Sequence, residues 1–217
     1  KDTLATWKAP AGVALNSDFT VKVRLQDGVW HTLSSYLIKV DEVRDTRHYV
    51  ENASMAIFDF TGKVEVAVTY NLGEVQTAKV RPLSYDIPFQ IDGNTVTFTL
   101  EHPRNLSVEV NGDIFHNLHL FTGSPERTIP DKDNPEVIYF GPGIHTVKNG
   151  ELRVPSGKTV YLAGGAFLMG RVLIENVHDV KLLGRGIIDY SIKGGIRIAN
   201  SRDVYVEGIV ATQCATG

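Results

Sequence analysis

The chain has 217 residues, of which 42% are apolar, enough to bury one large core or two ordinary ones. Its 22 basic and 25 acidic residues give a net charge of -3 and form no long block of one sign, so the composition argues against nucleic-acid and membrane partners. No apolar run approaches the length of a membrane span. These properties favour a globular protein with a neutral or weakly charged partner.

The first part of the chain alternates apolar and polar residues as half-buried strands do. Between residues 19 and 25, Val21 and Val23 share one face, while Lys22 and Arg24 share the other, which is the period of two expected for a strand. Similar runs follow at 55–60, 64–70, 75–80, 95–100 and 106–110. Helical periodicity is almost absent. This spacing predicts an all-β fold that begins with an antiparallel β-sandwich.

A polar connector follows these strands. The segment TGSPERTIPDKDNPE, residues 122–136, holds three prolines and six charged residues, a composition typical of a solvated linker. We therefore predict a sandwich domain over 1–122, a linker over 123–136 and a second domain over 137–217.

The second domain contains a repeat. Laying ELRVPSGKTVYLAGGAFL over RVLIENVHDVKLLGRGII and GIRIANSRDVYVEGIVA aligns columns of aliphatic residues with periods of 20 and 24. The columns are Leu152, Val172 and Ile196; Val154, Ile174 and Ile198; Val160, Val180 and Val204; and Leu162, Leu182 and Val206. Each repeat is too short to bury its own apolar face, so the repeats are expected to stack as a parallel β-helix. A second sandwich or a barrel is the alternative, since either can contain spaced V-x-V pairs.

Three segments resemble known carbohydrate-active families. VIYFGPGIHTVKNGELRVPSGKTVYLAGGAFLMGRV, residues 137–172, resembles the entry into the β-helix of the dextranases and isopullulanase of glycoside hydrolase family 49. The preceding residues 80–121 look like the last sandwich strands of those enzymes. GRGIIDYS, residues 184–191, is similar to an early-coil pattern of the family 28 polygalacturonases. The resemblance implies the first coils of a right-handed parallel β-helix.

Both families hydrolyse glycosidic bonds with inversion, using one carboxylic acid and further carboxylates that activate water. The family pattern places these groups in clusters such as N-x-D followed by paired aspartates, and neither cluster occurs in the predicted β-helix, residues 137–217. The catalytic residues therefore stay unknown. The chain is expected to be a truncated fragment of a glycoside hydrolase, silent by itself.

Three residues are candidates for binding substrate. Asp189 stands at the I-D position of the family 28 pattern, where a carboxylate on an outer strand face would bind sugar hydroxyls. The alternative is a turn aspartate that accepts backbone amides. Arg185 and Arg197 would contact an acidic sugar through paired hydrogen bonds; the alternative is a pair of arginines on a solvated sheet face.

No metal or cofactor is expected. His116 and His119 are three residues apart, which places them on opposite faces of a strand, so a zinc site shared with His145 is disfavoured. Asp131 and Asp133 are two acids of the connector, where solvation is commoner than calcium binding.

The single cysteine and three aromatic residues each allow a structural and a functional interpretation. Cys214 is the one cysteine, and its apolar neighbours favour a buried thiol over a nucleophile. Trp7, Trp30 and Tyr36 form either a platform for sugar rings or part of a core.

The sequence thus predicts a polysaccharide-degrading hydrolase of the dextranase or polygalacturonase type, secreted or periplasmic because polymers are attacked outside the cytoplasm. Two alternatives stay open: a polysaccharide lyase, which needs a basic residue to abstract a proton, and a β-helical adhesion protein without activity. The glycan, its linkage and the oligomeric state are not specified by the sequence.

Overall fold

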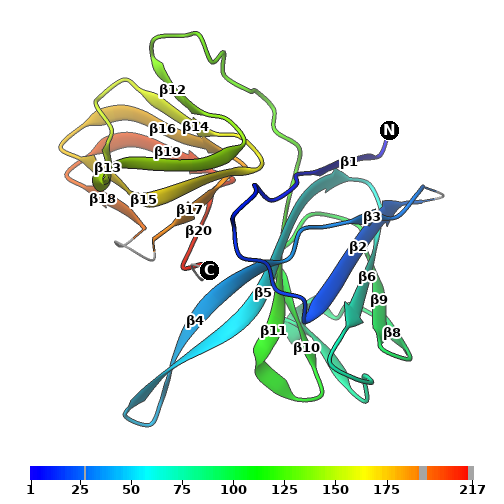
Figure 1. Ribbon diagram of the computed structural model, residues 1–217. Coiled ribbons are helices and arrows are strands. Elements are labelled where there is room, and N and C mark those ends of the chain that lie inside the picture. Colours follow the sequence, from blue (N-terminus) through cyan, green and yellow to red (C-terminus); the bar gives the residue numbers. More distant parts are fainter. Residues whose placement is uncertain (27, 191–194, 215–217) are drawn as a thin grey trace. The chain divides into compact units, whose positions relative to one another are not determined.

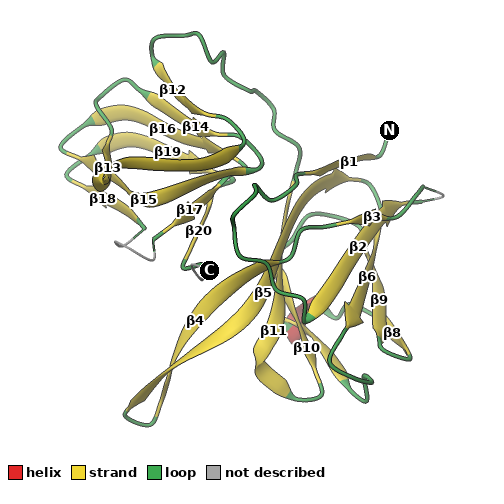
Figure 2. Cartoon of the chain, in the orientation of Figure 1, coloured by secondary structure: helices red, strands yellow, loops and turns green. Residues whose placement is uncertain are grey.

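A computed structural model describes residues 1–26, 28–190 and 195–214, and the backbone alone of 41–44. Ser191, the last residue of the GRGIIDYS segment, lies outside the described residues. Nearly all regular structure is strand, apart from the short 3-10 helix η1 (Leu83–Tyr85) (Figure 2). Within these ranges, no helix has the length and apolar character needed to cross a membrane. The all-β prediction is confirmed.

The chain divides into two compact units. One comprises Lys1–Lys8 and Ala14–Pro125, and the other comprises Ala9–Val13 and Glu126–Gly217. Each unit has a hydrophobic cluster of its own. The short segment Ala9–Val13 therefore groups with the second unit, although residues of the first unit flank it on both sides in the sequence.

The first unit is built from strands of 2 to 15 residues. They are β1 (Thr3–Thr6), β2 (Phe19–Leu25), β3 (His31–Thr32), β4 (Tyr36–Arg44), β5 (Arg47–Thr61), β6 (Val64–Tyr70), β7 (Ala78–Arg81), β8 (Phe89–Asp92), β9 (Thr95–Leu100), β10 (Leu106–Val110) and β11 (Asp113–Gly123). One sheet has the order β1-β5-β11-β10-β7, with β4 paired to β5, and the other has the order β3-β2-β6-β9-β8.

These two sheets pack on one another through a shared core. Along β6 the residues Val64, Val66 and Val68 are fully buried and alternate with partly exposed ones, as the period of two requires. The cluster that contains them also includes Phe58 from β5 and Leu118 from β11, which belong to the other sheet. The strand pairs are antiparallel except β5 with β11, which are parallel.

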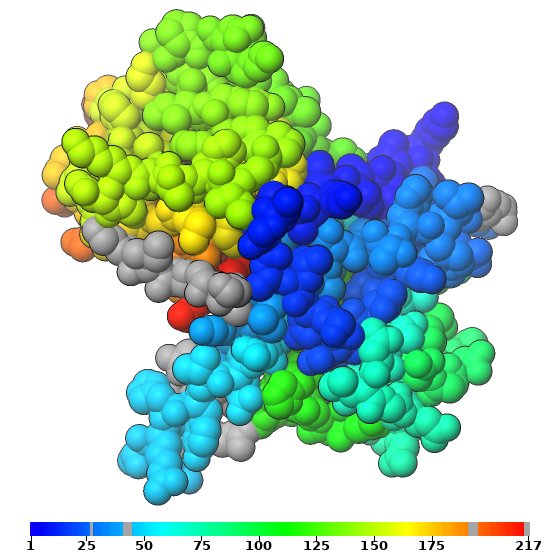
Figure 3. Space-filling model, viewed as in Figure 1, coloured from blue at the N-terminus to red at the C-terminus, as the bar shows by residue number. Residues whose placement is uncertain are grey.

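The hairpin of β4 and β5 extends beyond the rest of its sheet as a two-stranded arm (Figures 1 and 3). Residues 45–50 are exposed on both faces of the arm, so their sequence lacks the alternation that marks a half-buried strand. The sequence pattern therefore predicted β5 only from residue 55 onward and missed β4.

The second unit is a β-solenoid. Its strands are β12 (Val137–Phe140), β13 (Gly143–Arg153), β14 (Thr159–Leu162), β15 (Ala166–Glu175), β16 (His178–Gly184), β17 (Ile187–Asp189), β18 (Ile196–Ala199), β19 (Arg202–Glu207) and β20 (Val210–Thr212). They form the parallel sheets β12-β14-β16-β19 and β13-β15-β17-β20, with β18 also paired to β15 (Figure 1). The solenoid makes about three turns, which agrees with a parallel β-helix.

The aligned aliphatic columns are present in part. Leu152, Val172 and Ile196 lie in register on β13, β15 and β18, and Val180 lies opposite Val204 on β16 and β19. Stacked side chains of this kind form the solenoid core. A single repeat cannot bury these side chains alone, so the coils depend on one another for a hydrophobic core.

Two columns are shifted by two residues from the predicted alignment between the first and second coils. Val160 lies opposite Leu182 rather than Val180, and Leu162 lies opposite Gly184 rather than Leu182. The offset between paired residues is 20 at Arg153–Leu173 but 22 at Thr159–Lys181, so additional residues are taken up at the corner between the two sheets.

That corner differs in its backbone. In the second coil Asn176 and Asp179 both adopt left-handed conformations, with φ of 55° and 54°, and Asn200 and Asp203 repeat them in the third coil. In the first coil the left-handed position is Gly157. Asparagine and aspartate tolerate this conformation better than other non-glycine residues, so the N-x-x-D corners of the later coils hold the additional residues.

Candidate functional site

Asp189 is buried rather than presented to solvent. It lies on β17 between Met169 of β15 and Thr212 of β20, and its exposed fraction is 1%. The Cys214 backbone N–H donates to Asp189 Oδ1 at 3.1 Å. The expectation of an outward carboxylate is corrected, because the side chain is enclosed within the fold, where it accepts the backbone N–H of Cys214. The alternative of an aspartate that accepts backbone amides describes its role, on a strand instead of a turn.

Arg185 is also buried, in the loop between β16 and β17. Its Nη1 donates to the Gly184 carbonyl at 2.7 Å, and its Nη2 donates to Glu207 Oε1 at 3.0 Å. The next coil covers it, because a Cβ added at Gly208 would contact the guanidinium. The prediction of a sugar contact at Arg185 is corrected on the same ground: the guanidinium links two coils and does not reach the surface.

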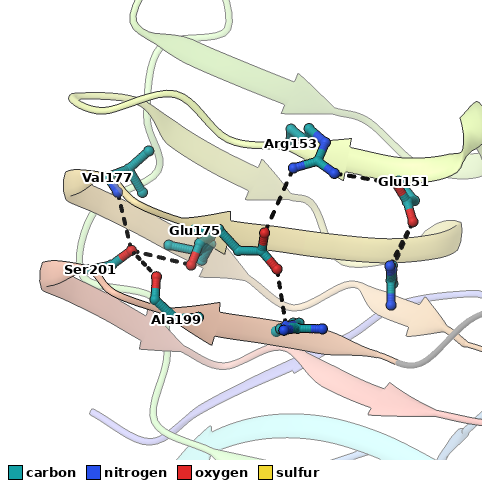
Figure 4. A network of polar contacts seen from close by, with 9 residues as sticks. Glu151, Arg153, Glu175, Val177, Ala199 and Ser201 are labelled. Atoms are coloured by element: carbon teal, nitrogen blue, oxygen red, sulfur yellow. Dashed lines mark hydrogen bonds and ion pairs between the residues drawn. The ribbon is translucent and has the colours of Figure 1, made fainter.

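Arg197 is the one predicted binding residue with an exposed side chain, at 63%. It belongs to a charged ladder on the outer face of β13, β15 and β18, which we define by Glu151, Arg153, Arg171, Glu175 and Arg197. Figure 4 shows Arg153 between Glu151 and Glu175. The ladder therefore crosses three coils.

The ladder contacts are ion pairs of uneven quality. Arg171 holds Glu151 Oε1 through Nε and Nη2 at 3.2 and 2.7 Å. Arg153 lies 4.0 Å from Glu151 and 3.7 Å from Glu175, and Arg197 Nε lies 3.0 Å from Glu175 Oε1. Each carboxylate is thus already engaged by a guanidinium. The arrangement stabilises the stacking of coils and holds Arg153 and Arg197 at the solvent boundary.

A second contact in Figure 4 joins the corners of successive coils. The Ser201 hydroxyl lies 3.2 Å from the Ile174 carbonyl and 2.9 Å from the Ala199 carbonyl, and it accepts the Val177 N–H at 3.3 Å. These bonds satisfy backbone groups at the corner. The role of Ser201 is structural.

The three aromatic candidates do not form one platform. Tyr36 is buried, with 4% exposed. Trp30 is 38% exposed, but the Arg24 guanidinium lies 4.4 Å from its ring centroid. Trp7 is half-buried. The core interpretation therefore fits Tyr36, and a cation–π contact occupies a face of Trp30.

The three candidate histidines are in separate environments. His116 contacts Asp113 and Glu51, and His145 Nε2 lies 2.6 Å from the Gly141 carbonyl. Burial lowers the pKa of His119. No group of three metal-ligating side chains is found within the described part of the chain.

Cys214 is buried, as its neighbours indicated, and carries no disulfide. Burial, together with the nearby Asp189 carboxylate, raises the pKa of its thiol to about 12. A thiol with so high a pKa is a poor nucleophile at neutral pH. The prediction of a buried, unreactive cysteine is supported by this environment.

A polar depression on the sandwich was missed by the sequence interpretation. It has a volume of about 730 Å³ and lies on the outer face of β6, β8 and β9. We call it the sandwich trough and define it by Glu65, Tyr85, Gln90, Thr97, Thr99 and Arg104. These residues come from β6, η1, β8, β9 and the loop that follows β9. The outward threonines of β9 were visible in the alternation, but nothing in the sequence joined them to Tyr85 or Arg104.

Comparisons with known proteins bear on the fold. No family model and no curated protein match the sequence. Among solved structures, the chain is similar to Dex49A from Penicillium minioluteum, with a TM-score of 0.65 over 97% of this chain and 14% identity. The match covers 61% of the Dex49A chain, so the chain spans less than two thirds of that protein. At this identity the similarity shows a shared all-β fold with a parallel β-helix.

Proposed function

We propose that the chain is part of a secreted glycoside hydrolase that degrades a polysaccharide. The observation that carries the proposal is the match of both units, over 97% of the chain, to the fold of Dex49A. The family 49 resemblance of residues 137–172 supports the same class independently, because it rests on sequence. Fold alone does not specify function, so activity is the decisive measurement.

Within this class we propose a neutral glucan rather than a polyuronate. Recognition of an acidic sugar needs free guanidinium groups for paired hydrogen bonds. Arg185 is bonded to Glu207 and Arg197 to Glu175. Each arginine is thus already neutralised by a carboxylate, which favours an uncharged substrate such as dextran.

The catalytic acid and base are proposed to lie outside the described residues. Inverting hydrolysis requires two carboxyl groups that face a common water. Asp189 is buried, and Glu151 and Glu175 are each held by arginines. These three carboxyl groups stabilise the solenoid, so we propose that other residues of the protein supply the catalytic acid and base.

A reducing-sugar assay of the protein as its source produces it tests the proposal. The substrates are dextran, pullulan and polygalacturonate, with the 217-residue chain as a parallel sample. We expect release from a neutral glucan by the natural protein and none from the chain alone. Release from no polymer contradicts the proposal, and an unsaturated uronate product identifies a lyase instead.

A non-catalytic adhesion protein is the second candidate. The observation in its favour is the charged ladder, which engages Glu151 and Glu175 in ion pairs that stabilise the stacked coils. A rigid rod needs no free carboxylate. Tight binding of a glycan by the natural protein without any hydrolysis supports this candidate.

A further inference from the structure

The floor of the sandwich trough is a row of polar side chains on the outer face of its sheet. Glu65 of β6 lies opposite Thr99 of β9, and Thr97 lies opposite Gln90 of β8. Phe98 and Leu100, which alternate with these threonines, are buried in the core. Within the described residues, no side-chain hydrogen bond involves Thr97, Thr99 or Gln90. The floor therefore offers two hydroxyls and a planar amide to a ligand.

The neighbouring threonine of the same face is different. Thr95 Oγ1 lies 3.0 Å from Thr69 Oγ1, so this hydroxyl already has a partner within the sheet. Neither Thr95 nor Asp92, which lies opposite it on β8, lines the trough. The unpaired groups thus coincide with the depression.

One rim of the trough is held in place by stacking. The Arg104 guanidinium lies 4.3 Å from the Tyr85 ring centroid, and Arg104 Nε donates to His102 Nε2 at 3.1 Å. Tyr85 keeps 37% of its surface exposed. Side chains already fixed in this way lose little conformational freedom when a ligand binds.

The charges around the trough balance. The basic side chains are Arg24, Lys63 and Arg104, and the acidic ones are Glu65, Asp86 and Glu101. Arg24 Nη2 lies 3.0 Å from Glu65, and Lys63 lies 3.4 Å from Glu101. A charged ligand gains no net attraction from this set, whereas a neutral ligand meets only hydrogen-bonding groups.

We infer that the sandwich trough binds a segment of a neutral oligosaccharide. Each sugar ring carries hydroxyls that both donate and accept, which matches the threonine hydroxyls and the Gln90 amide. The apolar face of a ring can lie against the exposed part of Tyr85. A few convergent polar groups beside an aromatic surface are typical of small-ligand sites. The inference requires no hydrolysis and shares with the proposed function only the class of glycan.

The test is affinity electrophoresis of the 217-residue chain in gels that contain dextran, pullulan or polygalacturonate. We expect retardation by a neutral glucan and none by polygalacturonate. In the double variant Gln90→Ala with Thr97→Val, the apparent Kd should weaken about tenfold, which corresponds to about 1.4 kcal/mol. The matched control is Asp92→Ala with Thr95→Val, which changes the same strands and face and should bind as the unaltered chain does.

Three results would overturn the inference: no retardation by either neutral glucan, equal retardation of the double variant and the control, or preference for polygalacturonate. Thermal unfolding of each variant verifies that it is folded. Loss of binding in the double variant, without hydrolysis by the natural protein, would sustain this inference and sink the proposed function. Hydrolysis of a polymer by the natural protein, together with unaltered glucan binding by the double variant, would support the proposed function and overturn this inference.

Discussion

At the scale of single residues, Gly208 shows how one backbone position controls the stacking of two coils. Its φ is +82°, and a Cβ there would contact Arg185 Nη1 and the Gly184 carbonyl. The Arg185 guanidinium, which is buried and bonded to Gly184, occupies the space that a side chain would need. Glycine at this position therefore permits both the left-handed backbone and the buried cation.

We expect Gly208→Ala to lower the free energy of unfolding of the solenoid by about 3 kcal/mol, because steric contact adds to backbone strain. Gly157→Ala is the control, since Gly157 has φ of +81° but no atom within 4 Å of the added Cβ. Its cost should be only the strain of about 1–2 kcal/mol. Urea unfolding measures both, and equal losses would contradict the role assigned to Gly208.

His116 of β11 contacts two carboxylates, one from Asp113 of the same strand and one from Glu51 of β5. Its Nδ1 lies 2.8 Å from Asp113 and its Nε2 lies 3.2 Å from Glu51. The hydrogen bond to Asp113, with the nearby charges of Asp113, Glu51 and Asp18, raises the pKa of His116. Burial acts to raise the pKa of Asp113, but hydrogen bonds from His116 and Phe115 lower it overall. The pair is therefore stabilised in its charged form.

Because the folded-state pKa of His116 is raised, its protonated side chain adds to the free energy of unfolding below pH 6.5, the ordinary pKa of histidine. This contribution is lost as the pH rises through the folded-state pKa. His116→Gln should therefore destabilise the sandwich below pH 6.5 and have no effect at clearly alkaline pH. The difference should stay under about 1 kcal/mol, because the site is partly exposed and screened. Thermal unfolding across this range measures it, and a deficit independent of pH would exclude protonation as its cause.

At the scale of elements, the charged ladder and the aliphatic columns stabilise the same coils to different extents. The ladder lies at the surface, with Arg153 and Arg197 exposed by 71% and 63%. Exposed ion pairs contribute little because water screens them. The columns exclude water entirely at residues such as Leu182 and dominate the stability of the solenoid.

Glu175→Gln removes the pairs with Arg153 and Arg197 at once. We expect a loss of under about 1 kcal/mol in low salt. The loss should nearly vanish in 1 M salt, where the Debye length falls to about 3 Å. Urea unfolding at the two salt concentrations makes the comparison. A loss that is large and insensitive to salt would show that the ladder is a primary determinant of stacking.

At the scale of the whole molecule, each of the two units has its own hydrophobic core. Leu118→Ala in the sandwich and Leu182→Ala in the solenoid are chemically identical changes at fully buried positions. Each should cost about 2–5 kcal/mol and destabilise only its own unit. Tryptophan fluorescence reports the sandwich, because both tryptophans, Trp7 and Trp30, lie there. Circular dichroism reports both units. Equal shifts by both probes in both variants would mean that the two cores unfold together.

The sequence by itself determined the position of each strand in which buried and exposed residues alternate. The bounds of β2, β6, β9 and β10 agree with the runs at 19–25, 64–70, 95–100 and 106–110. The solenoid followed in the same way, because its columns repeat a local pattern at a nearly constant period. The predicted boundaries of domain and linker stay predictions.

Only the tertiary structure decided which polar groups are accessible. Asp189 and Arg185 were both predicted to contact substrate at the surface, yet the fold buries both. Val160 pairs with Leu182 because corner conformations, rather than the aliphatic pattern, set the offset between coils. The sandwich trough joins Gln90, Thr97 and Arg104 from different segments. Periodicity reports which face of a strand is apolar, but exposure depends on what packs against that face, and that information is distributed over the whole chain.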